Sequence, residues 1–113
     1  MKQGEIWLIS LDPTVGAEIS KSRPVLIINT DSLGRLPLKI IAPITEWKEH
    51  YSNYPWMIKI IPTEQNNLSK TSAVDCFQIR SVSVDRFINH IGIIESKIFN
   101  NTQEAITKII SVI

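Results

Sequence analysis

The predicted fold is decided by two apolar stretches near the start of the chain, EIWLISL (residues 5–11) and PVLII (residues 24–28). The first stretch mixes apolar and β-prone residues and stops at Asp12-Pro13, which is a turn signal. The second is a β-branched run bounded by polar residues from Asn29 onward, a pattern typical of a buried strand. Both stretches are therefore predicted to be strands, with a loop over residues 12–22 between them.

The rest of the chain carries further strand signals, separated by turn signals. Apolar or mixed segments of this kind cover residues 38–44, 56–61, 72–82 and 90–94. Pro43 places the end of the 38–44 strand at an edge or a bend. Residues 46–55 have no period and are expected to form a long loop, and residues 83–86 are expected to form one capped helical turn.

The C-terminal tail changes to a helical period. One helical face collects the apolar residues Ala105, Ile106, Ile109, Ile110 and Ile113. Asn101, with Glu104 three positions later, resembles a capping box and is the expected helix start. Short strands closed by one amphipathic helix predict a mainly β fold with a C-terminal helix, built as a small, strongly bent antiparallel sheet or barrel.

Composition limits the class of protein. The 113 residues suit a single domain spanning residues 1–113, and they are 43% hydrophobic and 20% charged. The single cysteine, Cys76, favours a reducing compartment, and no stretch has the length and apolar character of a signal peptide or membrane span. We therefore expect a cytoplasmic protein without a membrane contact. Because the net charge is only +1, binding to a polyanion would require a local cluster of charge.

Several common kinds of catalytic site are not favoured by the sequence. Its four glycines form no phosphate-binding loop, and no spacing of cysteines and histidines is typical of a zinc site. Cys76 is expected in the middle of a strand, where a buried structural role is much more common than a nucleophilic one. His50 and His90 are paired with no carboxylate by spacing, so exposed or structural roles are favoured for both.

Two loops and one strand end hold the remaining candidates. Arg23 precedes Pro24 at the mouth of a buried strand, so its guanidinium is held in a defined place where it suits a phosphate or a carboxylate. A surface ion pair with Glu18 or Asp12 is the alternative, and it is the more common one. Thr45 ends an apolar strand; it is of interest only if the fold brings it beside Arg23.

The segment from Trp47 to Trp56 interleaves aromatic residues with Lys48 and His50. This composition is typical of a surface that stacks the bases of single-stranded nucleic acid. It fits equally well a loop whose rings pack onto the core or against a partner. The sequence is compatible with both interpretations, the base-stacking surface and the packed loop.

Taken together, these segments resemble the MazF/PemK (Kid) family of toxin–antitoxin ribonucleases. The resemblance covers nearly the whole chain and rests on several blocks in a fixed order. These blocks are Gly4–Trp7, Asp12–Glu18, Ser22–Ile28, Ala42–Thr45 and Asp75–Ser81. The short turn Asp85–Phe87 and the C-terminal helix follow in the expected order. One departure is Ala17, where the family commonly has serine and a hydroxyl contact to RNA.

The resemblance implies an SH3-like barrel of the MazF/CcdB type, a homodimer, and cleavage of single-stranded RNA that needs no metal and no cofactor. Cleavage would leave a 2′,3′-cyclic phosphate and a 5′-hydroxyl, and cutting mRNA would inhibit translation. The expected partner is a cognate antitoxin whose disordered acidic tail folds into the RNA groove.

The same resemblance assigns roles to residues of this chain. Arg23 and Thr45 match the catalytic pair, and Glu18 is a candidate to accept the proton of the attacking 2′-hydroxyl. The expected RNA-binding residues are Ser72, Gln78, Lys21 and Trp47. Two other functions remain as alternatives: a CcdB-like toxin that binds gyrase without cleaving RNA, and an SH3-like interaction module in which Arg23 only forms an ion pair.

Overall fold

The structure, a computed structural model, describes residues 1–11 and 22–112. Within these ranges the chain forms seven strands, four short 3-10 turns and one α-helix. The strands are β1 (Glu5–Ser10), β2 (Ser22–Ile27), β3 (Leu38–Glu46), β4 (Met57–Ile60), β5 (Ser72–Asp75), β6 (Arg80–Ser83) and β7 (Phe87–Ile93). The turns are η1 (Asp31–Leu33), η2 (Glu49–Asn53), η3 (Cys76–Gln78) and η4 (Val84–Arg86), and the helix is α1 (Ser96–Ile110).

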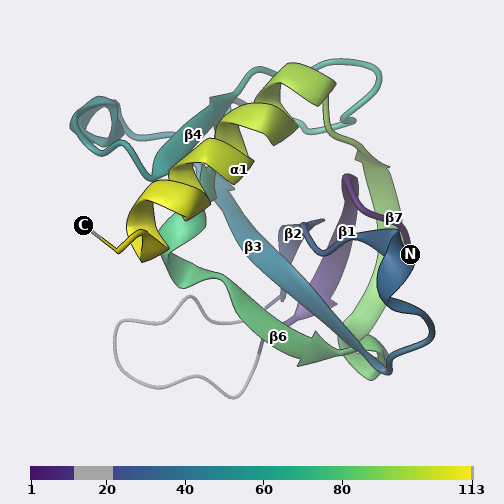
Figure 1. The fold of residues 1–113 in the computed structure, drawn as a ribbon. Helices are drawn as coiled ribbons and strands as arrows, with labels where there is room; N and C mark the ends of the chain where they lie inside the picture. Colours follow the sequence, from purple (N-terminus) through teal and green to yellow (C-terminus); the bar gives the residue numbers. More distant parts are fainter. Residues whose placement is uncertain (12–21, 113) are drawn as a thin grey trace.

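All recorded strand pairs are antiparallel, in the order β4-β5-β3-β2-β1-β7, with β6 paired to β3. Figure 1 shows α1 lying across the end of the sheet that holds β3 and β4, with β6 and β7 away from it. Among the described residues β4, β6 and β7 each pair with one strand only, so the recorded pairs do not close the sheet into a complete barrel. The predicted class, mainly β with a C-terminal helix, is confirmed.

Strand β3 is the centre of the fold because it changes partners along its length. One edge pairs with β2 at residues 41–43, while the other edge pairs first with β6 at residues 38–41 and then with β5 at residues 44–46. The predicted strand over residues 38–44 is present, but its predicted end at Ile44 is two residues too early. Pro43 has no N–H to donate, but β5 takes over the pairing from Ile44, and the strand continues to Glu46.

The predicted single strand over residues 72–82 is also wrong. The Asp75 carboxylate accepts a hydrogen bond from the Phe77 backbone N–H at 3.0 Å, which turns the chain into η3 before pairing resumes at Arg80. Cys76 therefore begins a turn and does not lie in the middle of a strand. By contrast, the capped turn predicted at residues 83–86 is present, with the Ser83 hydroxyl accepting from the Asp85 N–H.

Helix α1 begins at Ser96, earlier than predicted, and Asn101 lies inside it. Its start is fixed by the end of β7 and by Glu95, whose side chain binds neighbouring segments and does not cap the helix. The predicted apolar face is confirmed at Ala105, while Ile110 is 69% exposed and Ile113 lies outside the described residues.

Two hydrophobic clusters stabilise the sheet from opposite faces, because neighbouring residues of a strand point to opposite sides. The helix-side cluster lies under α1 and comprises Ile6, Leu26, Ala42, Ile44, Ile60, Val74, Cys76, Ile94 and Ala105. The other, named here the Trp7-side cluster, comprises Ile9, Leu11, Val25, Ile27, Ile41 and Val82 and packs against Trp7 and Phe87. β3 contributes to both clusters, which fixes its position firmly.

No helix in the described part of the chain combines the length and the apolar character needed to cross a membrane.

Candidate functional site

A cavity of about 390 Å³ lies where β2, β3 and β5 meet. Its described lining comes from three segments that are distant in sequence: residues 22–24, residues 44–48 and residues 68–72. The lining residues are Ser22, Arg23, Pro24, Ile44, Thr45, Glu46, Lys48, Leu68, Ser69, Lys70 and Ser72. Three of the residues predicted from the sequence, Arg23, Thr45 and Ser72, thus come together in one cavity.

The strand register explains why Arg23 and Thr45 meet. β2 and β3 pair through Val25 and Pro43, and continuing this antiparallel register by two residues places Arg23 opposite Thr45. The recorded pairing ends at Pro43, beyond which β3 binds β5 on its other edge. The two strand ends therefore flank an open space into which both side chains can reach. This arrangement satisfies the condition that the sequence left open for Thr45.

Arg23 carries a buried donor that lacks an acceptor. Its Nε atom is buried, and none of the described residues accepts a hydrogen bond from it. Buried polar groups are normally hydrogen-bonded, so an unpaired guanidinium N–H on a residue that lines a cavity is unusual, and the guanidinium group suits an anionic ligand. The surface ion pair with Asp12 or Glu18 involves residues outside the described ranges.

The wall opposite Arg23 is formed by the segment that joins β4 to β5. Ser72 is buried, and its hydroxyl donates to the Lys70 carbonyl at 2.8 Å, which shapes the turn into β5. Lys70 Nζ lies 3.5 Å from Glu46 Oε2, so an ion pair joins this wall to the end of β3. Both side chains of that pair are more than half exposed, at 61% and 52%, which makes it a weak contact in water.

The side chain of Asn66 holds this wall of the cavity in place through hydrogen bonds. Its side-chain oxygen accepts from the N–H groups of Thr63 and Leu68, and its amide donates to the Ile61 carbonyl and to Glu95. Asn66 is fully buried. The segment also lies directly against β7, where a Cβ atom at Gly92 would be 2.4 Å from the Asn66 carbonyl oxygen.

Gln78 and Trp47 are not among the residues that line the cavity. Gln78 ends η3 and hydrogen-bonds the Asp75 carboxylate. Trp47 follows the cavity residue Glu46, but its ring packs edge-on against Tyr51 with Lys59 Nζ at 5.0 Å from its centre. Glu18 and Lys21, and the departure at Ala17, lie outside the described residues.

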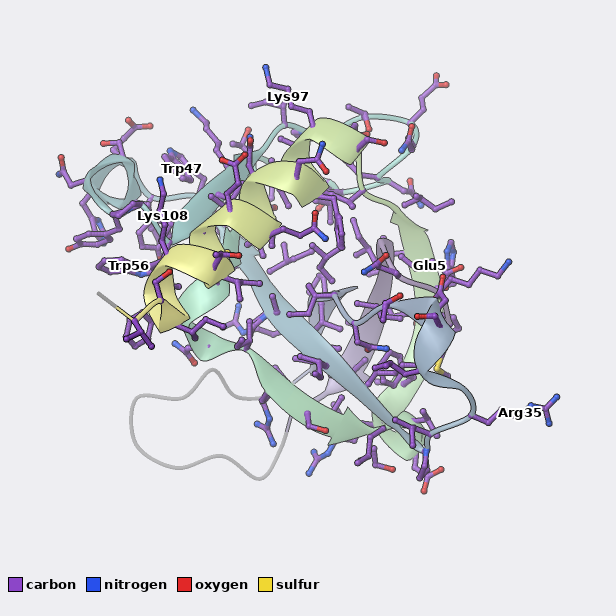
Figure 2. The ribbon with its side chains drawn as sticks, viewed as in Figure 1. Glu5, Arg35, Trp47, Trp56, Lys97 and Lys108 are labelled. Atoms are coloured by element: carbon purple, nitrogen blue, oxygen red, sulfur yellow. The ribbon has the colours of Figure 1, made fainter. Side chains whose placement is uncertain are left out.

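The predicted aromatic segment forms a cluster of rings around η2. Tyr54 and Trp56 stack at a centroid distance of 4.9 Å, and His50 lies edge-on to Tyr51 and Tyr54. Trp56 packs against the helix-side cluster, and Tyr54 stays 38% exposed. In Figure 2, Trp47 and Trp56 lie on the same side of the molecule, beside η2 and β4. The segment thus has rings that pack inward and a ring that faces solvent.

Other titratable residues do not suit nucleophilic catalysis. Burial raises the pKa of the Cys76 thiol to about 12, with a further contribution from the Asp75 charge, so this thiol stays protonated at neutral pH. Burial also raises the pKa of Asp75 above its ordinary 3.8, against hydrogen bonds from Phe77 and Gln78 that lower it. In the part of the chain that the structure describes, no three metal-binding side chains are grouped.

Lys70 was not predicted as a residue of this site, and Lys48 was predicted only as part of a possible nucleic-acid surface in the aromatic segment. Only the pairing of β3 with β5 brings the segments of these two lysines together. Their proximity to Arg23 gives the cavity three basic side chains and one acidic one, Glu46. This is the local cluster of charge that a chain of net charge +1 requires to bind a polyanion.

Comparison with known proteins finds a matching protein family and related sequences and structures. The model of PemK-like, MazF-like toxins of type II toxin–antitoxin systems matches residues 2–110. Endoribonuclease PemK of Escherichia coli is 32% identical over 85 residues, which make up 74% of this chain and 62% of PemK. That alignment spans less than two thirds of the length of PemK.

Two further relatives match over most of their length. Endoribonuclease MazF9 of Mycobacterium tuberculosis is 26% identical over 110 residues, covering 94% of this chain and 92% of MazF9. The crystal structure of MazF from Deinococcus radiodurans superposes with a TM-score of 0.82, covers 99% of this chain and 97% of that one, and is 17% identical. At that identity the superposition establishes a shared fold.

Proposed function

Because the chain belongs to the family of PemK-like, MazF-like toxins of type II toxin–antitoxin systems, we propose that it is an endoribonuclease acting on single-stranded RNA. The observation that carries this proposal is the cavity shared by Arg23 and Thr45, with the buried Arg23 Nε facing no acceptor among the described residues. The names of PemK and MazF9 as endoribonucleases support the same activity. By cutting mRNA, the protein inhibits translation, and we place this activity in the cytoplasm.

In the proposed reaction the RNA supplies its own nucleophile. The 2′-oxygen attacks the adjacent phosphorus, the bond from phosphorus to the 5′-oxygen breaks, and the products carry a 2′,3′-cyclic phosphate and a 5′-hydroxyl. The protein must hold the three reacting atoms in line and stabilise the charge that develops on the phosphoryl oxygens. No step of this scheme requires a metal ion.

Arg23 and Thr45 suit that task because they approach one cavity from two strand ends. The guanidinium offers several donors in a fixed plane and stays charged, and the Thr45 hydroxyl adds one further donor. The proton of the 2′-hydroxyl must pass to a base, for which Glu18 is our candidate. The leaving 5′-oxygen gains a proton from water, and Arg23 assists its departure through hydrogen bonds while staying charged. Ser72, which lines the cavity, is proposed to bind RNA near the reacting phosphate, and Gln78, Lys21 and Trp47 are proposed as further RNA-binding residues.

The proposed assembly is a homodimer that pairs with a cognate antitoxin. The family description names a toxin of a type II toxin–antitoxin system, which supports an antitoxin as partner. A disordered acidic tail suits a groove with three basic side chains, because it matches the charge of RNA and covers a broad surface.

The test is cleavage of end-labelled single-stranded RNA in EDTA by the wild type, Arg23→Ala and Thr45→Val. We expect each variant to lose about a hundredfold or more in rate, the usual effect of removing one preorganised donor. Arg35→Ala is the matched control, because Arg35 is exposed on a loop away from the cavity and carries the same charge (Figure 2).

The product ends and the folding of each variant complete this experiment. The new 5′ ends should accept phosphate from a polynucleotide kinase without prior phosphatase treatment. Circular dichroism should show unchanged folding. Cleavage that survives Arg23→Ala would remove the assigned site. A wild type that binds gyrase and leaves RNA intact would establish the CcdB-like alternative, and one that does neither would favour the interaction module.

A further inference from the structure

Two lysines stand opposite one another at the mouth of the cavity. The β3–β5 ladder pairs Glu46 with Ser72, and the Trp47 N–H donates to the Thr71 carbonyl at 3.1 Å, so the register continues past both strands. One further step places Lys48 opposite Lys70. Both side chains are exposed, and both line the cavity.

This juxtaposition is unfavourable without a counter-charge. Like charges directly opposite on neighbouring strands repel each other and destabilise the pair. Glu46 relieves part of the repulsion through its ion pair with Lys70 at 3.5 Å. Among the described residues no carboxylate lies within ion-pair distance of Lys48 Nζ. The rim of the cavity therefore holds a positive charge that is only partly neutralised.

The size of the cavity shows where the rest of an RNA strand must lie. A volume of about 390 Å³ is at the small end of ligand sites, which span about 300–1,000 Å³. Such a space suits one nucleotide around Arg23 and Thr45. The neighbouring nucleotides of a strand that threads this site must then pass over the rim, and each brings one negative phosphate.

We propose that Lys48 and Lys70 form a second phosphate subsite, which binds the RNA backbone next to the scissile phosphodiester, and that Glu46 competes with RNA for Lys70. This inference rests on the proposed ribonuclease function and extends it. The subsite acts on binding and not on chemistry, because neither lysine is needed at the reacting atoms. Glu46 lowers the affinity for RNA by occupying one of the two cations.

The test measures binding to a fluorescent single-stranded RNA of mixed sequence with 2′-O-methyl sugars, which cannot supply the attacking hydroxyl. Affinity is followed by anisotropy between about 50 and 200 mM NaCl. The variants are Lys48→Gln, Lys70→Gln and their double. The control is the double variant Lys97→Gln/Lys108→Gln, which removes the same net charge from two exposed positions on α1 (Figure 2).

We expect each rim lysine to account for one phosphate contact. The slope of log affinity against log salt should then fall in magnitude by about 0.7 for each single variant and about 1.4 for the double. The α1 control should keep the wild-type slope. In cleavage assays the rim double variant should raise KM and leave kcat at saturating RNA unchanged.

The variant Glu46→Gln should change the affinity for RNA in the opposite direction. Removing this carboxylate frees Lys70, so RNA should bind about twofold to fivefold more tightly, as expected for the loss of an exposed competing ion pair. Glu64→Gln, an exposed acidic residue that is not among those lining the cavity, is the charge-matched control and should have a smaller effect. Equal effects of the two variants would overturn the competition by Glu46.

The experiments distinguish a failure of the second phosphate subsite from a failure of the proposed function. If the rim double variant keeps the wild-type slope and KM, or changes both no more than the α1 control, the second subsite is refuted while Arg23-dependent cleavage still stands. If the wild type does not cleave RNA, the proposed function fails, and the subsite fails with it.

Discussion

The buried Nε atom of Arg23 carries a cost in stability that an anionic ligand would offset. This atom has no acceptor among the described residues, and an unmet buried donor costs about 1–3 kcal/mol. An RNA phosphate would supply the missing acceptor. Such residues are expected in binding sites, because a group that is held in position for a ligand lowers the stability of the ligand-free protein.

Arg23→Met tests this cost directly. Methionine keeps an unbranched apolar stem of similar reach and removes the unpaired donor, so the free energy of unfolding should stay constant or rise by about 1 kcal/mol. Urea denaturation measures this change, with Arg35→Met as the exposed control. A fall of more than about 1 kcal/mol for Arg23→Met would indicate that Arg23 stabilises the fold through contacts of its own.

At the scale of elements, the segment between β4 and β5 links the cavity wall to the far side of the sheet. Asn66 ties it to the start of α1 through Glu95, and Gly92 lets it lie against β7. The same segment provides Leu68 and Lys70 to the cavity. Packing at β7 therefore decides the shape of a site to which β7 contributes none of the described lining residues.

Asn66→Ala should destabilise the protein by about 2–4 kcal/mol, because it removes a fully buried side chain and leaves two part-buried N–H groups and one carbonyl without their partner. Gly92→Ala should cost at least as much, since the Asn66 backbone would have to move. Chemical denaturation measures both. The exposed Asn89→Ala should change stability by less than about 0.5 kcal/mol, and a similar small change for Asn66→Ala would contradict the role of this network.

Elements that depend on local pattern could be predicted from the sequence, and those that depend on distant partners could not. The β1 and β2 strands and the Ser83 cap follow from apolar runs and turn residues close in sequence. The break at Asp75 was missed because an alternating pattern does not reveal that a carboxylate will bind the backbone two residues on. The helix start was missed because Glu95 is held by Asn66 and Thr63, far away in sequence.

The same distinction applies to the site. Arg23 and Thr45 were predicted together through a family resemblance, and the β2–β3 register gives the physical reason for their meeting. The meeting of Lys48 and Lys70 was missed because their pairing exists only across β3 and β5. Roles for Glu18 and Lys21 stay predictions, since both lie outside the described residues.

At the scale of the whole molecule, the position of the charged side chains matters more for RNA binding than the net charge. A chain of net charge +1 exerts little long-range attraction on RNA. A homodimer would bring two such cavities into one particle and double the number of basic side chains available to a strand. In the proposed homodimer, dimerisation would therefore contribute to substrate binding as well as to assembly.

Light scattering coupled to size-exclusion chromatography tests the dimer. We expect a mass of twice the 12.8 kDa of one chain at micromolar concentration. Apolar side chains that are exposed in one copy, Leu33, Leu36, Leu38 and Ile40 among them, are consistent with a covered surface in the assembly. A mass of 12.8 kDa that does not change with concentration would contradict this expectation.

The position of Thr45 at the end of β3 has one more consequence. This strand runs between both hydrophobic clusters, with Ile41 in one and Ala42 and Ile44 in the other. The hydroxyl thus sits on a strand that is anchored in both clusters, where local opening is expected to be rare and amide exchange slow. Thr45 should therefore keep its position until the domain unfolds as a whole, so control of the proposed activity would depend on blocking the cavity and not on local unfolding of this strand.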